Sequence, residues 1–285
     1  MKLDTIFVAT LSVLGLSSHA AACTDFEVFA QPVGDEGYNP NTLAPATLQI
    51  ELILPAGPAQ ASCASHKIEL VSQTSFGVRD LSDGRATIEG TIPADQSAFA
   101  AFNDTTIRLS QAAVDELITT GSFVFDYSWI QPGQFFPVGT YTNVLNVNVN
   151  GAQVTSVEPE LAVFPAVRLL GDVSSGYGQV DFGALESFEE ATVNFIYQSN
   201  AELSVTAQSQ NGEQLVHEDG ARIYAVPYST YINGAPMVAN GTSRMSLGSK
   251  TGRRSIGTIR LQLGDIGTPV AGEYADVLTL SFTAN

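Results

Sequence analysis

Short runs in which apolar and polar residues alternate recur along the whole chain. A period of two predicts half-buried β-strands, and the Gly, Pro, Asn and Asp residues between the runs favour turns. The expected strands span 47–54, 67–71, 85–92, 105–109, 191–197, 201–208, 222–232 and 254–263. Only residues 111–119 fit a short helix. Many short strands with one helix predict an all-β fold of the sandwich or barrel type.

One strand pattern occurs twice. Residues 139–149 (GTYTNVLNVNV) return 133 residues later as residues 272–282 (GEYADVLTLSF), with Gly, Tyr, Val and Leu in register and Asn143 aligned with Asp276. Alternation gives each copy one apolar face, made of Tyr141, Leu145, Val147 and Val149 in the first and of Tyr274, Leu278, Leu280 and Phe282 in the second. The repeat predicts two copies of one sandwich, each ending in the same core strand.

The repeat also sets the expected domain limits. We predict a leader at 1–22, an N-terminal domain at 23–155 and a C-terminal domain at 160–285. The polar stretch 150–159 contains Gly and Pro and suits an interdomain link. Alternatively, residues 152–157 pair back as the last strand of the first domain, and residues 161–170 open the second.

The first residues have the pattern of a secretory signal peptide. Lys2 supplies the positive start, residues 6–16 are apolar, and residues 17–22 are small enough for cleavage. This apolar stretch is too short to anchor the chain in a bilayer. We therefore expect an exported protein without membrane insertion.

Composition narrows the range of partners. Hydrophobic residues make up 44% of the chain, and the formal net charge is −17 with only 14% charged residues. A surface this acidic repels phosphate backbones, so no nucleic-acid partner is expected. Cys23 and Cys63 are the two cysteines, and an even pair in an oxidising compartment predicts a disulfide. The alternative is that Cys23 is the lipidated first residue of a lipoprotein, which would leave Cys63 unpaired.

The two Gly-x-Tyr-x-Asn/Asp-x-Leu strands resemble those of a known family. Further similar segments are 181–183 with 192–195, 211–215 and 227–234, and the cysteine pair matches where such subunits tie their first two strands. At these residues the sequence resembles the spore coat protein U domain family of secreted chaperone–usher pilus subunits. The resemblance is closer in the second half of the chain than in the first.

The resemblance implies two tandem immunoglobulin-like β-sandwiches, the second an incomplete pilin-type sandwich lacking its last strand. In such subunits a periplasmic chaperone fills the resulting groove, and the arm of the next pilus subunit replaces it at the outer-membrane usher. The sequence stops at Asn285, directly after the repeated strand. We therefore expect the edge of the groove at Tyr274, Leu278, Leu280, Phe282 and Asn285, with the terminal carboxylate held by the chaperone.

The same resemblance implies a place in the fibre. A mature chain that starts beside Cys23 has no arm to donate, and a subunit that only accepts a strand belongs at the end of a fibre. We therefore predict a fimbrial tip adhesin that passes through the periplasm to the cell surface and promotes attachment to abiotic or host surfaces and biofilm formation. The alternatives are a structural pilus or spore-coat-like subunit with no ligand, and a secreted carbohydrate-binding module.

Two aromatic segments are candidates for adhesive loops. The candidate residues are Trp129, Ile130, Phe135 and Phe136 around a Pro-Gly turn, with Phe99 and Phe102 in a second segment. These side chains either contact apolar surfaces or sugars, or fill the sandwich core, and the sequence leaves both interpretations open.

Signatures of catalysis are weak. Residues 250–252 (KTG) match one β-lactamase element but lack the others, and His66 and His217 lack metal-ligand spacing. We predict no enzymatic activity, no metal and no cofactor, and we interpret Glu186, Glu189 and Glu190 as a solvated acidic face.

Overall fold

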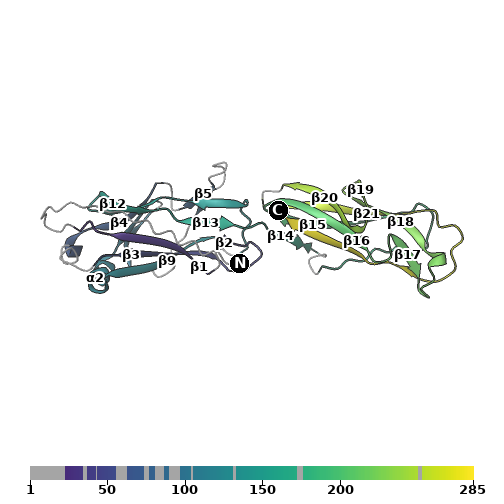
Figure 1. The fold of residues 1–285 in the computed structure, drawn as a ribbon, viewed down its shortest axis with the longest axis horizontal. Helices are drawn as coiled ribbons and strands as arrows, with labels where there is room; N and C mark the ends of the chain where they lie inside the picture. Colours follow the sequence, from purple (N-terminus) through teal and green to yellow (C-terminus); the bar gives the residue numbers. More distant parts are fainter. Residues whose placement is uncertain are drawn as a thin grey trace, which may run out of the picture.

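The structure is a computed structural model that describes residues 23–34, 37–42, 44–55, 63–73, 77–80, 87–89, 97–103, 105–130, 133–171, 176–249 and 252–285. The predicted leader lies outside these residues. The chain forms an all-β fold, as the alternation predicted, with two lobes placed end to end (Figure 1). None of the helices in the described part has the length and apolarity needed to span a bilayer.

The N-terminal lobe contains three sheets around one core. Its strands are β1 (Glu27–Val33), β2 (Gly37–Tyr38), β3 (Ala46–Ile53), β4 (Ile68–Ser72), β5 (Gly77–Asp80), β6 (Thr87–Glu89), β7 (Phe99–Phe102), β8 (Thr106–Leu109), β9 (Ser122–Ile130), β10 (Gly139–Thr142), β11 (Leu145–Val149), β12 (Ala152–Val157) and β13 (Glu160–Val163). They pair in the orders β1-β3-β9, β2-β13-β10-β5-β6 and β12-β11-β4-β8-β7. Alternate residues of β3 and β11 are buried, which explains their period of two.

The C-terminal lobe contains two facing sheets. Its strands are β14 (Val167–Leu170), β15 (Glu190–Ser199), β16 (Glu202–Ser209), β17 (Gln214–His217), β18 (Val226–Ile232), β19 (Ala235–Met237), β20 (Asn240–Ser249), β21 (Arg254–Leu263), β22 (Tyr274–Ala275) and β23 (Leu278–Ala284). The larger sheet has the order β14-β15-β21-β18-β17-β22 with β19 beside β18, and the smaller sheet is β20-β16-β23. The strand expected at 222–232 begins later, because Arg222–Tyr224 forms the short 3-10 helix η3.

Strand pairing assigns the residues of the predicted link to the N-terminal lobe. β12 pairs antiparallel with β11, and β13 pairs with β10 and β2, so residues 152–157 and 160–163 extend its sheets. The change of lobe falls between β13 and β14. Residues 152–157 do pair back, as the alternative expected, because the turn Asn150–Gly151 reverses the chain with φ angles of 51° and 86°. They are not the last strand of this lobe, however, because β13 follows them there and residues 161–163 therefore do not open the second lobe. The domain limits themselves remain a prediction.

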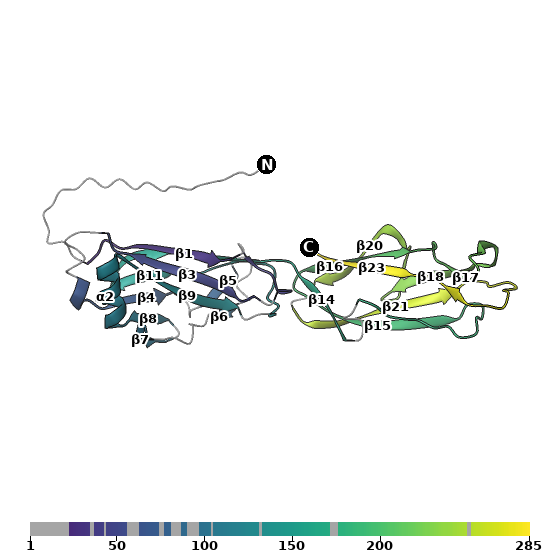
Figure 2. The ribbon, with the colours of Figure 1, turned by 90° about the horizontal axis from the view of Figure 1, so that it is seen from below.

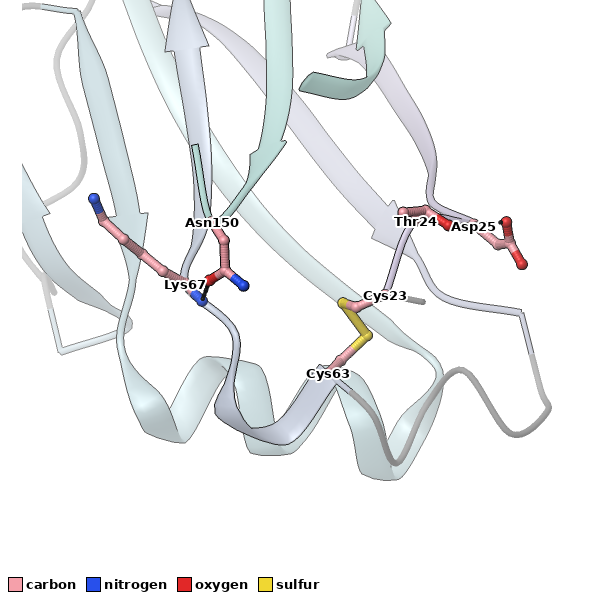
Figure 3. The surroundings of a disulfide bond; sticks show 6 residues. All are labelled: Cys23, Thr24, Asp25, Cys63, Lys67 and Asn150. Atoms are coloured by element: carbon pink, nitrogen blue, oxygen red, sulfur yellow. Dashed lines mark hydrogen bonds between the residues drawn. A yellow bond between two sulfur atoms is a disulfide. The ribbon is translucent and has the colours of Figure 1, made fainter. Parts of the chain in front are cut away.

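The predicted disulfide joins Cys23 to Cys63 with a Cα–Cα distance of 5.0 Å. It links the segment before β1 to the 3-10 helix η1 (Cys63–Ser65), as Figure 3 shows. The predicted helix is α2 (Gln111–Thr120), capped by the Ser110 hydroxyl, which accepts a hydrogen bond from Ala113 N. Gly121 ends this helix in the left-handed conformation at φ 81°.

The two copies of the repeated strand have the same local structure. Gly139 and Gly272 have φ angles of 154° and 150°. The tyrosine two residues later donates a hydrogen bond to the carbonyl four residues before it in both copies, Tyr141 to Pro137 at 2.8 Å and Tyr274 to Val270 at 3.1 Å. The sequence repeat is therefore also a repeat of local structure.

Candidate functional site

The outer edge of β23 has no partner strand in the part of the chain that the structure describes. β23 pairs with β16 from Leu278 opposite Ser209 to Ala284 opposite Leu203, and with no other strand. β14, at the edge of the facing sheet, likewise pairs only with β15. In Figure 2 both strands reach the end of the lobe that faces the N-terminal lobe. The two unpaired edges leave backbone N–H and C=O groups available to an added strand.

The inward side chains of β23 are incompletely covered. Leu278, Leu280 and Phe282 pack against the core cluster that contains Phe195 and Val205, yet all three are only partly buried. The rings of Phe282 and Phe195 lie 5.3 Å apart, so the strand does face the core. Val167 and Leu169 of β14 pack against the same cluster and are also partly buried. Together these side chains form an apolar strip that an added strand could cover.

In the N-terminal lobe the repeated strand is β11, and its inward side chains are covered. Leu145, Val147 and Val149 of β11 are only 2%, 0% and 6% exposed. β11 has β4 on one side and β12 on the other, whereas β23 has a neighbour on one side only. The difference in burial therefore follows from one missing neighbour rather than from the pattern of the strand.

Asp276 fixes the start of β23. Its carboxylate accepts hydrogen bonds from the Ser209 hydroxyl, from Tyr228 OH at 2.6 Å and from Asn211 N at 3.0 Å. Burial, together with this bond to Asp276, raises the pKa of Tyr228. In the first lobe the Ser72 hydroxyl donates to Asn143 Oδ1 at 3.2 Å in the same way, and Asn143 Nδ2 donates back to the Ser72 hydroxyl at 2.8 Å. The open edge is thus held by a polar network and is not a frayed end.

The remaining predicted edge residues lie at opposite ends of this strand. Tyr274 belongs to β22 and packs edge-on against His217, with ring centroids 5.0 Å apart. Asn285 N donates to Glu202 O at 2.9 Å, so the last residue continues the pairing with the start of β16. Tyr274 therefore lies on the edge strand of the larger sheet, whereas Leu278, Leu280 and Phe282 lie along β23 in the smaller one, with Asn285 directly after it, and their contact with a chaperone stays a prediction.

The sequence missed three contributors to this region. Val167 and Leu169 supply the facing apolar edge, and Ser209 supports Asp276. Ser209 is the counterpart of Ser72, since they lie opposite Leu278 and Leu145 respectively, but this equivalence is visible only in the strand pairing. No local pattern identifies β14 as an edge strand.

The described adhesive candidates do not gather in one patch. Phe135 lies at the junction of the lobes, 5.1 Å below the Arg168 guanidinium. Phe136 is partly buried against the N-terminal core, and Phe99 packs edge-on against Phe125 at 5.3 Å. Trp129 and Ile130 lie in β9 and Phe102 in β7, but the positions of their side chains lie outside what the structure describes. The adhesive role of this set remains a prediction.

No group of three or more His, Cys, Asp or Glu residues within the described ranges is arranged to hold a metal ion. His217 instead bridges segments of the fold. Its Nδ1 lies 2.9 Å from the Asp219 carboxylate and its Nε2 lies 3.2 Å from Ala271 O. The bond to Asp219, followed by that to Ala271, raises the pKa of His217. Its role here is to join the β17 turn to the segment before β22.

No family model matches the chain, and no curated protein matches it. Among solved structures, a chain of the CsuC–CsuE chaperone–tip adhesion subunit pre-assembly complex from archaic chaperone–usher Csu pili of Acinetobacter baumannii is 16% identical, with a TM-score of 0.45 and coverage of 82% of this chain and 90% of that one. The CFA/I adhesin CfaE of enterotoxigenic E. coli is 9% identical, with a TM-score of 0.36 and coverage of 94% and 83%. Because these likenesses are distant, we base the functional proposal on the geometry of β23.

Proposed function

We propose that this chain is a fimbrial tip adhesin that promotes surface attachment and biofilm formation, assembled by donor-strand complementation. In this proposal the C-terminal lobe accepts a strand, first from a periplasmic chaperone and then, at the outer-membrane usher, from the next pilus subunit. The N-terminal lobe is the part that meets an abiotic or host surface.

One observation supports the strand-accepting part of this proposal. β23 leaves Leu278, Leu280 and Phe282 partly exposed, whereas the equivalent side chains of β11 are covered once β12 lies beside them. Exposed apolar edges invite pairing with another chain, so a folded protein that keeps one in solution needs a partner for it. An extended segment with alternating apolar residues satisfies both the backbone and the apolar strip.

A matched pair of substitutions on β23 tests strand acceptance. Leu280→Asp places a charge on the inward face, whereas Thr279→Asp places one on the exposed face of the same strand. We expect Leu280→Asp to remove the protein from fibres sheared off the cells that make it, and Thr279→Asp to leave incorporation unchanged. Normal incorporation of a folded Leu280→Asp protein would contradict the proposal.

A tip position is tested separately, by N-terminal sequencing of the secreted protein. A mature start beside Cys23 supports an end subunit, because the chain then has no donor arm. A start well upstream of Cys23 favours a shaft or adaptor subunit instead.

A structural subunit without a ligand is the second candidate. Phe136 and Phe99 pack against the N-terminal core, and Phe135 contacts Arg168 at the lobe junction. These contacts favour the structural subunit, because they give the three side chains a role in the fold. Replacing Trp129 and Phe136 by Ser distinguishes the two. Loss of attachment by fibres that still assemble supports the adhesin, and unchanged attachment supports the structural subunit.

A further inference from the structure

The free end of the C-terminal lobe carries exposed apolar side chains that its own core does not use. We call this end the pole and define it by residues 186–189, 217–225 and 264–273, at the end of the molecule opposite the N-terminal lobe (Figure 2). Phe188 is 64% exposed, Ile223 84% and Val270 37%. Large apolar side chains so exposed at one end of a lobe indicate an interaction surface.

The three segments of the pole form one connected surface. Phe188 N donates to Gly264 O at 3.3 Å, and Ile266 N donates to the Ser187 hydroxyl at 3.2 Å. Segments 217–225 and 264–273 are joined where Glu218 N donates to Glu273 O at 2.8 Å. The contacts of His217 with Ala271 and with the Tyr224 ring, 6.4 Å away, join η3 to the same surface. The apolar side chains are therefore presented from a fixed platform.

Phe188 is held in a backbone conformation that its side chain disfavours. Its φ angle is 66°, in the left-handed region where bulky residues are rare. The turn is fixed by Glu189 N donating to Glu186 O at 3.2 Å. Gly or Asn would suit this turn better, and the aromatic ring gains little burial in return. Strain of this kind at an exposed residue points to a role outside the fold.

The pole is also acidic. Exposed carboxylates surround the apolar side chains: Glu186, Glu218, Asp219, Asp265 and Glu273. The basic side chains of the pole are Arg222, in η3, and His217, which is already paired with Asp219. A complementary surface would therefore carry Lys or Arg around an apolar contact.

The direction of β23 identifies which molecule can reach the pole. β23 starts near the pole, where β22 pairs with β17, and it ends at Ala284 near the N-terminal lobe. At that second end the two lobes touch: Arg168 donates to Pro40 O at 2.6 Å and Val138 N donates to Asn200 O at 3.2 Å. A strand that fills the β23 edge also runs along the lobe to the pole, so a folded body attached at the pole-side end of that strand lies beside the pole.

We propose that the pole is a second docking surface, which binds the folded body of the same polypeptide whose strand fills the β23 edge. This proposal rests on the strand-accepting part of the proposed function. The partner is a protein with an apolar contact for Phe188 and Ile223 inside a basic rim.

Site-specific photocrosslinking in the full-length chain, in the cells that assemble the fibre, tests this docking. Benzoylphenylalanine replaces Phe188 at the pole, Ser281 on the exposed face of β23, or Ile256, which is 70% exposed on β21 away from the pole. Position 281 reports the strand donor and position 256 is the matched control. We expect positions 188 and 281 to capture the same protein, with at least a ten-fold higher yield at 188 than at 256.

The outcomes separate the two proposals. Capture at 281 without capture at 188, or capture of a different protein at 188, overturns the docking surface and leaves strand acceptance intact. Equal yields at 188 and 256 also overturn it. No capture at either 188 or 281 overturns both proposals.

Discussion

Supplying the missing neighbour of β23 in the same chain should stabilise the C-terminal lobe. In the N-terminal lobe, Asn150–Gly151 turns the chain from β11 into β12. Adding Gly-Ala-Gln-Val-Thr-Val-Thr-Val after Asn285 creates the same Asn–Gly turn. An antiparallel return then places the three valines opposite Phe282, Leu280 and Leu278.

The expected gain follows from the burial of these side chains. Full burial of a Leu or Phe side chain contributes about 1.5–3 kcal/mol, so covering three half-buried ones contributes about 3 kcal/mol. Burial of the added valines and the new ladder hydrogen bonds roughly offset the entropy lost in ordering the tail. For a lobe of this size about 3 kcal/mol corresponds to a rise in Tm of about 10 °C.

Calorimetry with size-exclusion chromatography measures this effect. The control tail replaces its three valines with lysines and keeps the same length and turn. We expect the valine tail to raise the Tm of one transition and to keep the protein monomeric, and the lysine tail to do neither. Equal transitions for the parent, valine-tail and lysine-tail proteins would refute the inference that β23 has an open acceptor edge.

Three further predictions concern residues that stabilise each lobe internally. The raised pKa of His217 stabilises the folded state while the ring is protonated, so its contribution is complete below the unfolded pKa of about 6.5 and is lost as the pH rises through the higher folded value. Urea unfolding of the C-terminal lobe at acidic and alkaline pH measures this, and the His217→Gln protein should lack it. Asp276→Ala leaves the Ser209 and Tyr228 hydroxyls without their acceptor and should cost about 3 kcal/mol in chemical unfolding. Removing the Cys23–Cys63 disulfide, which spans 40 residues, should cost the N-terminal lobe about 4 kcal/mol.

Each of these predictions has a result that contradicts it. A pH profile shared by the parent and His217→Gln proteins would assign the dependence to another group. Asp276→Asn keeps one acceptor oxygen, like the Asn143 Oδ1 that accepts from Ser72 in the first lobe, so it should lose less stability than Asp276→Ala. Equal losses would mean that the carboxylate network does not hold β23. A Cys23→Ser, Cys63→Ser protein as stable as the parent would show that the cross-link is dispensable.

Local pattern was sufficient for some of the elements and for the repeat, but β1, β9 and β20 were not among the expected strands. Alternation at 47–54 and 254–263 predicted β3 and β21, and the stretch at 111–119 predicted α2. The cysteine count predicted the disulfide. These features depend on residues near one another or on the number of thiols, so one sequence contains them.

The functional interpretation of the aromatic residues could not be made in the same way. Phe135 contacts Arg168 because two lobes meet there, and neither residue lies in the other's local sequence. Phe188 gives no signal in the alternation, because its importance depends on a positive φ angle and on exposure at the pole. Both properties arise only when distant segments pack.

The sequence by itself indicated an all-β chain, several of its strands and the strand pattern that recurs at 139–149 and 272–282. It could not distinguish the two copies by alternation, since 139–149 and 272–282 have the same apolar positions; only the family resemblance indicated that the second lacks a neighbour. Tertiary structure decided that β12 covers β11 and that β23 is left with one free edge. The physical reason is that a strand's side-chain period is local, whereas its neighbours are chosen by backbone pairing between segments far apart in the chain.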